Sequence, residues 1–420
     1  MKSSFHHTVT TKRRGRVLEK KVHTYTQKIS RLLKKNDYTA PESSLVIAGD
    51  TKYQNAITKA LKPFKGVKHV VLVGIGGSSL GTEAVYHALA WKTSPKLLVL
   101  DQIEKDALLR VETLVKEIDN PRGIVLVVVS KSGTTTETML NGIKALEICE
   151  KKFGKEYNKR TIFIGNADTP FLKIGKKKKI LCFTMPDIIG GRYSVFTAVG
   201  IVPLTLLGID TQSLREGALS LFEKNEMAHI ERSAVSLAEA AEHGVHTVNF
   251  FTFSERLELC GYWYRQLLAE SIGKRMTTKG ASFAHQLLPV VTTSADLHSM
   301  AQLYLGGYKN MYTYFVDYDE KSPYHLLAKH WLIEHVPFLA GSEVYKVKEA
   351  IRKGVLQAYD DQKLPYRYSE MPKCTAYEIG VLLSSSMCEV MCLAHVLNVN
   401  AFDQPSVELY KKHTRAILDS

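Results

Sequence analysis

The chain lacks the features that mark secreted, membrane-spanning and fibrous proteins. Its 420 residues include six cysteines and no Cys-x-x-Cys pair, so no disulfide framework is predicted and the thiols are expected to be reduced. No run of 18 or more apolar residues is present, which argues against a membrane-spanning helix. The first 16 residues are basic but lack the apolar stretch of a secretory signal. With 45% hydrophobic and 23% charged residues, the composition is that of a globular protein, which we expect in the cytoplasm.

The excess of positive charge is confined to the N-terminus. The formal net charge is +14, and residues 1–36 hold eleven Lys or Arg against one acid, Glu19, which leaves +4 for the rest. Apolar residues recur here at spacings of 4, 3, 4 and 3, which predicts an amphipathic helix. The plain interpretation is a helix docked on the core with a solvated basic face, and attachment to nucleic acid or a membrane surface is the alternative. No nucleic-acid-binding signature supports that alternative. The apolar residues are Leu18, Val22, Tyr25, Ile29 and Leu32.

Short apolar runs alternate with helical patterns in the first half, which predicts an α/β fold with a parallel sheet between helix layers. The run 124–129 is apolar at every position, as in a strand that is buried on both faces. The predicted strands are residues 70–73, 97–100, 124–129, 161–164 and 180–183, and the predicted helices are 79–91, 105–118, 137–152 and a short stretch at 171–174.

The second half repeats this alternation less clearly, and a boundary between two units is predicted near residues 208–214. No low-complexity linker or fixed-period repeat is present. The predicted strands are 245–251 and 311–316, and the predicted helices are 255–271, 294–305, 324–334, 344–357 and 376–398.

The segment 129–138, VSKSGTTTET, follows a predicted buried strand and opens a helix. A helix N-terminus offers free backbone N–H groups and a partial positive charge, so it binds anions. Hydroxyl groups and one lysine would complete a phosphate site there, and a simple helix cap is the alternative. The side chains of this candidate site are Ser130, Lys131, Ser132, Thr134 and Thr135.

A glycine-rich segment, GIGGSSLG at 74–81, follows the first predicted strand. It is not a dinucleotide fingerprint, because Ser79 stands where the last glycine is needed. Alone it is ambiguous between a nucleotide and a sugar phosphate. Two polar loops at the carboxyl ends of strands in one sheet nevertheless indicate a single ligand in one crevice.

Three further segments place polar groups where packing does not require them. Arg192 follows two glycines, which let the backbone turn tightly and present its side chain. Gln266 and Glu270 share one helix face, and Glu270 falls in the last turn, where the helix dipole makes a carboxylate a better proton acceptor. Gln404 precedes a helix start, and Lys411 lies seven residues beyond it. For each residue considered alone there is a plainer alternative: Glu270 as a surface acid, Arg192 as a salt-bridging arginine and Lys411 as a solvated lysine.

Together these segments resemble the phosphoglucose isomerase family over roughly residues 65–415. DIIGGRYSVFT at 187–197 fits one family signature throughout. FDQPSVELYKK at 402–412 fits a second, with Ser406 where the family usually shows Gly or Ala. The segment 294–300, SADLHSM, is similar to the histidine segment of short bacterial members. The resemblance implies two sugar-isomerase domains, at 41–210 and 211–400, and a C-terminal helical segment at 401–420 that completes the active site. The basic helical arm at 1–40 lies outside the resemblance and is predicted from its charge and apolar spacing alone.

The resemblance also implies an activity and a set of roles. The reaction is the interconversion of glucose 6-phosphate and fructose 6-phosphate through a cis-enediol. Glu270 is the base, His298 assisted by Lys411 opens the sugar ring, and Arg192 stabilises the enediolate. The expected assembly is a homodimer in which His298 completes the partner's site, with no cofactor, no metal and no membrane. The expected substrate contacts are Gly77, Ser78, Ser130, Lys131, Ser132, Thr135, Gln266 and Gln404.

Two alternatives stay open at this point. A dual-specificity phosphoglucose/phosphomannose isomerase shares the domains but generally lacks the paired signatures around Arg192 and Gln404. A non-catalytic sugar-phosphate sensor would keep the loop at 129–138 but has no use for Glu270, Arg192, His298 and Lys411 together.

Overall fold

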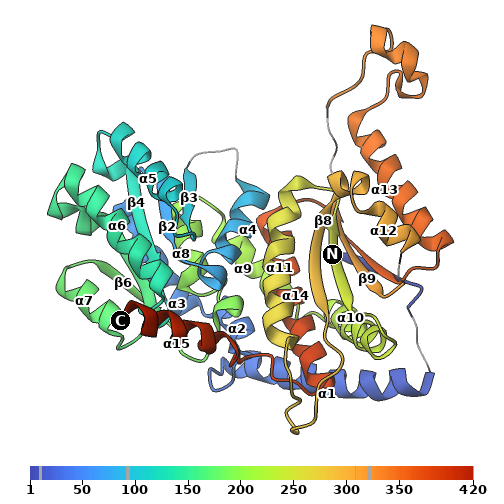
Figure 1. Cartoon of the computed structure of the whole chain (residues 1–420), viewed down its shortest axis with the longest axis horizontal. Helices are drawn as coiled ribbons and strands as arrows, with labels where there is room; N and C mark the ends of the chain where they lie inside the picture. Colours follow the sequence, from blue (N-terminus) through green and yellow to red (C-terminus); the bar gives the residue numbers. More distant parts are fainter. Residues whose placement is uncertain (9–11, 91–94, 308, 320, 322, 420) are drawn as a thin grey trace.

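The chain forms two α/β units side by side, each built on a five-stranded sheet with helices on both faces (Figure 1). The computed structural model describes residues 1–8, 12–90, 95–307, 309–319, 321 and 323–419. The predicted α/β class is therefore confirmed, and the domain limits at 40, 210 and 400 stay predictions.

The first sheet is wholly parallel, in the order β3-β2-β4-β5-β6. Alternate residues of its strands belong to different cores, so Val127 packs with α3 and α8 while Val128 packs with α5 and α6. All five predicted strands are present, and β4 is buried at every residue as expected. The strands are β2 (His69–Val73), β3 (Lys96–Leu100), β4 (Ile124–Val129), β5 (Thr161–Asn166) and β6 (Leu181–Met185).

The four predicted helices of the first unit are present and agree within a few residues, whereas the helices Ser43–Val46, Thr51–Leu61 and Ala198–Leu206 were not predicted. The expected helix 79–91 ends at Leu89, and residue 91 lies outside the described residues. The short stretch at 171–174 is the centre of α7. The helices are α2 (Ser43–Val46), α3 (Thr51–Leu61), α4 (Leu80–Leu89), α5 (Lys105–Glu117), α6 (Thr136–Phe153), α7 (Pro170–Lys177) and α8 (Ala198–Leu206).

The second sheet has the order β1-β10-β9-β7-β8, and β1 is antiparallel to β10. The other four strands are parallel and connect in the same order as in the first unit, because β7, β8 and β9 repeat the arrangement of β2, β3 and β4. Only β7 and β9 were predicted. The strands are β1 (Lys2–His6), β7 (Thr247–Thr252), β8 (Leu288–Thr293), β9 (Met311–Tyr318) and β10 (Tyr366–Met371).

Two of the predicted helices of the second unit differ in the structure, and the helices Thr211–Ser220 and Lys224–Glu242 were not predicted. The expected helix 294–305 is divided into a 3-10 turn, Ser294–His298, and the short helix α12. The expected helix 324–334 is wrong, because this stretch has a 3-10 turn only at Trp331–His335. The helices are α9 (Thr211–Ser220), α10 (Lys224–Glu242), α11 (Glu258–Ile272), α12 (Ala301–Gly306), α13 (Val344–Asp361), α14 (Ala376–Val396) and, at the end of the chain, α15 (Val407–Leu418).

One helix among the described residues, α14, is long and apolar enough to cross a membrane by those two criteria alone. Within the structure 94% of that stretch is buried, and its side chains pack in the largest core of the protein. A buried core helix passes the same test, so this is weak evidence for a membrane.

The N-terminal arm is a helix docked on the second unit, as its apolar spacing predicts. In α1 (Lys12–Lys35) the residues Leu18, Val22, Tyr25 and Ile29 are buried in the core shared with α10 and α14, and Leu32 is half-buried. Figure 1 shows α1 running beneath these helices. The arm is not helical throughout, because residues 2–6 form β1 at the edge of the second sheet.

Candidate active site

One cleft of about 690 Å³ lies where the loops after β2 and β4 meet the turn Gly191–Tyr193, the end of α11 and the helix α15. Figure 1 shows α15, in dark red, reaching across from the second unit to the first. Ten of the twelve predicted site residues line it: Gly77, Ser78, Lys131, Ser132, Thr135, Arg192, Gln266, Glu270, Gln404 and Lys411.

The loop after β4 has the form of an anion site. Helix α6 begins at Thr136, and the hydroxyl groups of Ser132 and Thr134 lie 2.9 Å apart at its N-terminal end. Gly133 has a positive φ of 68°, and a Cβ there would lie 2.4 Å from the Cβ of Phe171, so only glycine fits. Free N–H groups and hydroxyls at a helix N-terminus are suited to a phosphate.

Ser130 is placed differently from the prediction. It is buried beneath the loop and does not line the cleft. Its Oγ accepts the backbone N–H of Gly133 at 3.1 Å and lies 3.5 Å from the Oγ1 of Thr135. The hydrogen bonds of Ser130 therefore hold the loop in place from its buried side.

Lys131 connects the anion loop to the turn that carries Arg192. Its Nζ donates to the backbone carbonyls of Asp187, at 2.8 Å, and Ile189, at 3.1 Å. Burial lowers the pKa of this ammonium group, and the nearby Asp187 offsets part of that effect. A predicted phosphate ligand thus also fixes a neighbouring loop.

The glycine-rich loop after β2 packs directly on the same turn. A Cβ at Gly77 would lie 2.3 Å from the carbonyl carbon of Gly191. Gly76 has a positive φ of 59°, and a Cβ there would lie 2.9 Å from the Nε2 of Gln266. These glycines allow two loops and a helix to approach closely. This close packing accounts for the glycines, so a nucleotide-binding site is not needed to explain them.

Arg192 is buried and uses all five of its N–H donors. Its Nε donates to Ser271 Oγ at 2.9 Å, and its Nη1 donates to Glu270 Oε2 and Gln404 Oε1, both at 3.1 Å. Its Nη2 donates to the backbone carbonyls of Ala401 and Asp403. The guanidinium therefore joins α11 to the segment that precedes α15.

Glu270 lines the cleft and is partly open to solvent. Its Oε1 accepts a hydrogen bond from Gln266 Nε2 at 2.8 Å while its Oε2 faces Arg192. Lys274, which is nearly buried, supports this helix end by donating to the carbonyl of Glu270 at 2.9 Å and pairing with Asp403 at 2.9 Å. Burial lowers the pKa of Lys274.

Helix α15 adds residues that the sequence patterns did not indicate. Arg415 donates to Thr134 Oγ1 at 3.2 Å, so the helix lies against the anion loop. Thr414 of the same helix also lines the cleft, and so does Asn166 at the end of β5. Lys411 lines it too, paired with Glu408 at 2.8 Å. The contact between Arg415 and Thr134 joins segments about 280 residues apart, which no local pattern can reveal.

His298 is the predicted catalytic residue that a single chain does not bring to the cleft. It is exposed at the end of the 3-10 turn after β8. In the part of the chain that the structure describes, no histidine lines the cleft. Within the same described residues no group of three or more His, Cys, Asp or Glu is placed to hold a metal ion.

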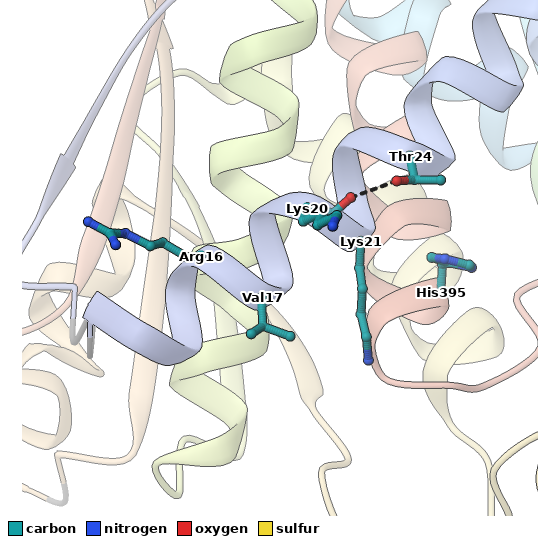
Figure 2. A pocket seen from close by; sticks show the side chains of 6 residues that line it. All are labelled: Arg16, Val17, Lys20, Lys21, Thr24 and His395. Atoms are coloured by element: carbon teal, nitrogen blue, oxygen red, sulfur yellow. Dashed lines mark hydrogen bonds between the residues drawn. The ribbon is translucent and has the colours of Figure 1, made fainter.

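A second hollow, of about 400 Å³, lies along α1 and contains none of the predicted site residues (Figure 2). Its lining is mainly the apolar stems of basic side chains, with His395 from α14 at one end. Val17 and Lys21 point to the same side of the helix, and Arg16 points away (Figure 2). It offers neither an acid–base pair nor convergent donors like those around Glu270.

Comparisons with known proteins identify the family of the chain. The family model described as phosphoglucose isomerase matches residues 58–420. A glucose-6-phosphate isomerase of Clostridium tetani is 31% identical, over 86% of this chain and 83% of its own. One of Carboxydothermus hydrogenoformans is 30% identical, over 84% and 79%. A crystal structure of a hypothetical protein of Thermus thermophilus has the same fold, with a TM-score of 0.84, 22% identity and full coverage of both chains. The chain therefore belongs to the phosphoglucose isomerase family.

Proposed function

We propose that the protein interconverts D-glucose 6-phosphate and D-fructose 6-phosphate by ring opening and proton transfer through a cis-enediol. The observation that carries the proposal is the position of Glu270. Its carboxylate lies between Arg192 and Gln266 in a cleft whose other side is an anion loop. A 6-phosphate held at that loop would leave the opposite end of the sugar beside the carboxylate.

The proposed chemistry needs a base, a stabiliser and an acid. Glu270 takes the proton from C2 of the open-chain aldose and returns it to C1, with the O1 and O2 hydrogens redistributed, so that no atoms are gained or lost. Arg192 stabilises the negative charge that develops on the enediolate oxygens. Phosphate binding far from the reacting carbons supplies orientation energy.

The remaining contacts divide between phosphate and sugar. We assign the phosphate to the loop of Lys131, Ser132 and Thr135, with Ser130 supporting it from below. We assign the sugar hydroxyls to Gly77, Ser78, Gln266 and Gln404. Neither a cofactor nor a metal has a part in this scheme.

We further propose that the protein is a C2 homodimer in which His298 of the partner subunit, assisted by Lys411, protonates the ring oxygen. The absence of a histidine from the described cleft lining supports this assignment. We place the enzyme in the cytoplasm, and the six cysteines, which form no disulfide within the described residues, support this.

The experiment for the base is Glu270→Gln, which keeps the shape of the side chain but cannot accept a proton. Turnover is expected to fall by about 10²–10⁴-fold, and exchange of the C2 hydrogen with D2O should fall equally. Binding of a competitive 6-phosphorylated sugar acid, measured by calorimetry, should persist. Glu147→Gln, on the exposed face of α6, is the control. Near-normal turnover in Glu270→Gln would remove this carboxylate from the mechanism.

The shared site has its own test by complementation. Glu270→Gln and His298→Ala homodimers should each be nearly inactive. Refolding them as an equal mixture makes about half of the dimers mixed, each with one intact site, so activity should recover to about a quarter of wild type. No recovery despite demonstrated subunit exchange would place both groups in one chain.

A further inference from the structure

The anion loop after β4 carries one cation of its own, and that cation is largely engaged elsewhere. Lys131 has three N–H donors, and two of them go to the backbone carbonyls of Asp187 and Ile189. The polar side chains that accompany it in the loop are hydroxyls, which carry no charge. Because a phosphate monoester holds a charge of about −1.5 to −2 at pH 7, the loop alone does not match the charge of its proposed ligand.

Two other cations of the cleft already face an acid. Arg192 faces Glu270 at 3.1 Å, and Lys411 pairs with Glu408 at 2.8 Å. In the proposed function both act on the sugar, Arg192 at the enediolate oxygens and Lys411 near the ring oxygen. The phosphate therefore needs a cation from another part of the cleft lining.

Arg415 is placed to supply that charge. It lies on α15, which reaches across to the first unit (Figure 1), and its side chain lines the cleft. Its Nη2 donates to Thr134 Oγ1 in the anion loop at 3.2 Å. Within the part of the chain that the structure describes, this guanidinium forms no salt bridge, and its hydrogen-bond acceptor is a neutral hydroxyl. It can therefore receive an anion at the loop without first giving up an ion pair.

We propose that Arg415 binds the phosphate of the substrate, opposite the hydroxyls and backbone N–H groups of the anion loop. The inference rests on the proposed function, in which the loop holds a 6-phosphate. A guanidinium remains charged at every working pH and presents a planar fork of donors that fits two phosphate oxygens at once. The ligand that this pair of surfaces suits is a dianionic phosphate monoester, and the bond to Thr134 is exchanged for the phosphate when it binds.

The test is Arg415→Met, with Lys412→Met as the matched control. Each removes one exposed cation from α15, a helix in which no residue is buried, so neither should disturb the core. Lys412 differs in that it does not line the cleft. The probe is inorganic phosphate at about 0.1–50 mM, with the ionic strength held constant by NaCl, and the readout is the midpoint of thermal unfolding.

A ligand of the folded protein raises this midpoint according to its dissociation constant. Arg415→Met should need about 10–100-fold more phosphate than the wild type for the same rise, which is the usual effect of losing hydrogen bonds to a charged group. The control should respond like the wild type. Arg415→Lys, which keeps the charge but loses the fork, should recover only part of the affinity.

Steady-state kinetics separate phosphate binding from a purely structural role. If Arg415 binds the phosphate, KM for fructose 6-phosphate should rise by the same factor as the phosphate concentration required above. The value of kcat should stay within about threefold of wild type, because the lost contact is made equally in the ground state and the transition state. If Arg415 only held α15 and Lys411 in place, kcat would fall while phosphate affinity stayed the same.

Three results would overturn the proposal. One is a wild type whose unfolding midpoint does not respond to phosphate, and another is an Arg415→Met protein that responds like the Lys412→Met control. The third is a fall in kcat with unchanged phosphate affinity. Because phosphate binding is measured without turnover, the two assignments fail separately. An inactive wild type whose phosphate binding depends on Arg415 would refute the isomerase alone, and an active one indifferent to Arg415 would refute the phosphate contact alone.

Discussion

Substituting Gly77 by alanine tests whether the approach of two loops positions the reacting groups. The new Cβ would lie 2.3 Å from the carbonyl carbon of Gly191 and 2.7 Å from the backbone nitrogen of Arg192. Ordinary carbon–carbon contact begins near 3.5 Å, so the loops must separate by about 1 Å. All of these contacts are with backbone atoms, which cannot rotate away. The displacement therefore reaches Arg192 and, through its hydrogen bond, Glu270.

A displacement of about 1 Å at a reacting group can cost on the order of 10²-fold in rate, and we expect kcat of Gly77→Ala to fall by that amount. The matched control is Gly190→Ala in the facing turn. There φ is −73° and the nearest atoms lie 4.0 Å from the new Cβ, so activity should stay near wild type. Initial rates in a coupled assay give kcat and KM, and thermal unfolding shows whether both variants fold. A folded Gly77→Ala enzyme with wild-type kcat would refute the argument that loop contact sets the geometry.

Two further substitutions test the role of Lys131 in holding the turn before Arg192 and the docking of α1 on the core. Lys131→Met should lower kcat as well as raise KM for 6-phosphorylated sugars, because it releases the turn held at Asp187 and Ile189; a change in KM alone would mean that the lysine serves only the phosphate. Ile29→Ala in α1 should lower the free energy of unfolding by about 2–5 kcal/mol in urea titrations, while the exposed Lys20→Ala should change it by less than about 0.5 kcal/mol. Equal effects of the two would mean that the apolar face of α1 does not hold the helix on the core.

The first unit could be predicted from the sequence because its local patterns and its burial agree. Every residue of β4 is apolar and every one is buried. The stripe of α1 is likewise apolar where it meets α10 and α14. Hydroxyl-rich and glycine-rich loops were recognisable because their residue types exceed what a helix cap or a simple turn requires.

The strand β10 shows why the second unit was harder to predict. Its sequence, YRYSEM, places Arg367 and Ser369 among aromatic residues, yet both are buried. Arg367 pairs inside the protein with Glu389 of α14, and its guanidinium stacks over Tyr314 at 3.5 Å. Polar residues at core positions hide a strand from any hydrophobicity pattern, because the partner that makes their burial tolerable lies elsewhere in the chain.

The site was predictable in its residue types but not in its contacts. Arg192 donates all of its N–H groups to partners within the protein, on α11 and in residues 401–404. These two segments are far apart in the chain, so no local sequence pattern could predict the contacts. Only the guanidinium bonds to Glu270 and Gln404 face the cleft. Charge on a bound enediolate would therefore be met by exchanging one of these two partners, while the backbone contacts keep the guanidinium in place.

The two units share one order of strand connection, yet among the described residues the loop that has the form of an anion site lies at the carboxyl edge of the first sheet. At the corresponding place after β9, Asp317 is buried and faces Lys348 at 3.5 Å, and Arg352 pairs with Glu370 at 2.7 Å. Lys348 and Arg352 thus each have an acidic partner, and the chain continues into the exposed segment 323–343 instead of a hydroxyl-rich loop like the one after β4. The shared topology supplies two equivalent sheet edges, and the loops decide their use. The first edge presents the hydroxyl-rich loop to the cleft, whereas the second unit contributes the helix that carries Glu270 and exposes the turn that carries His298.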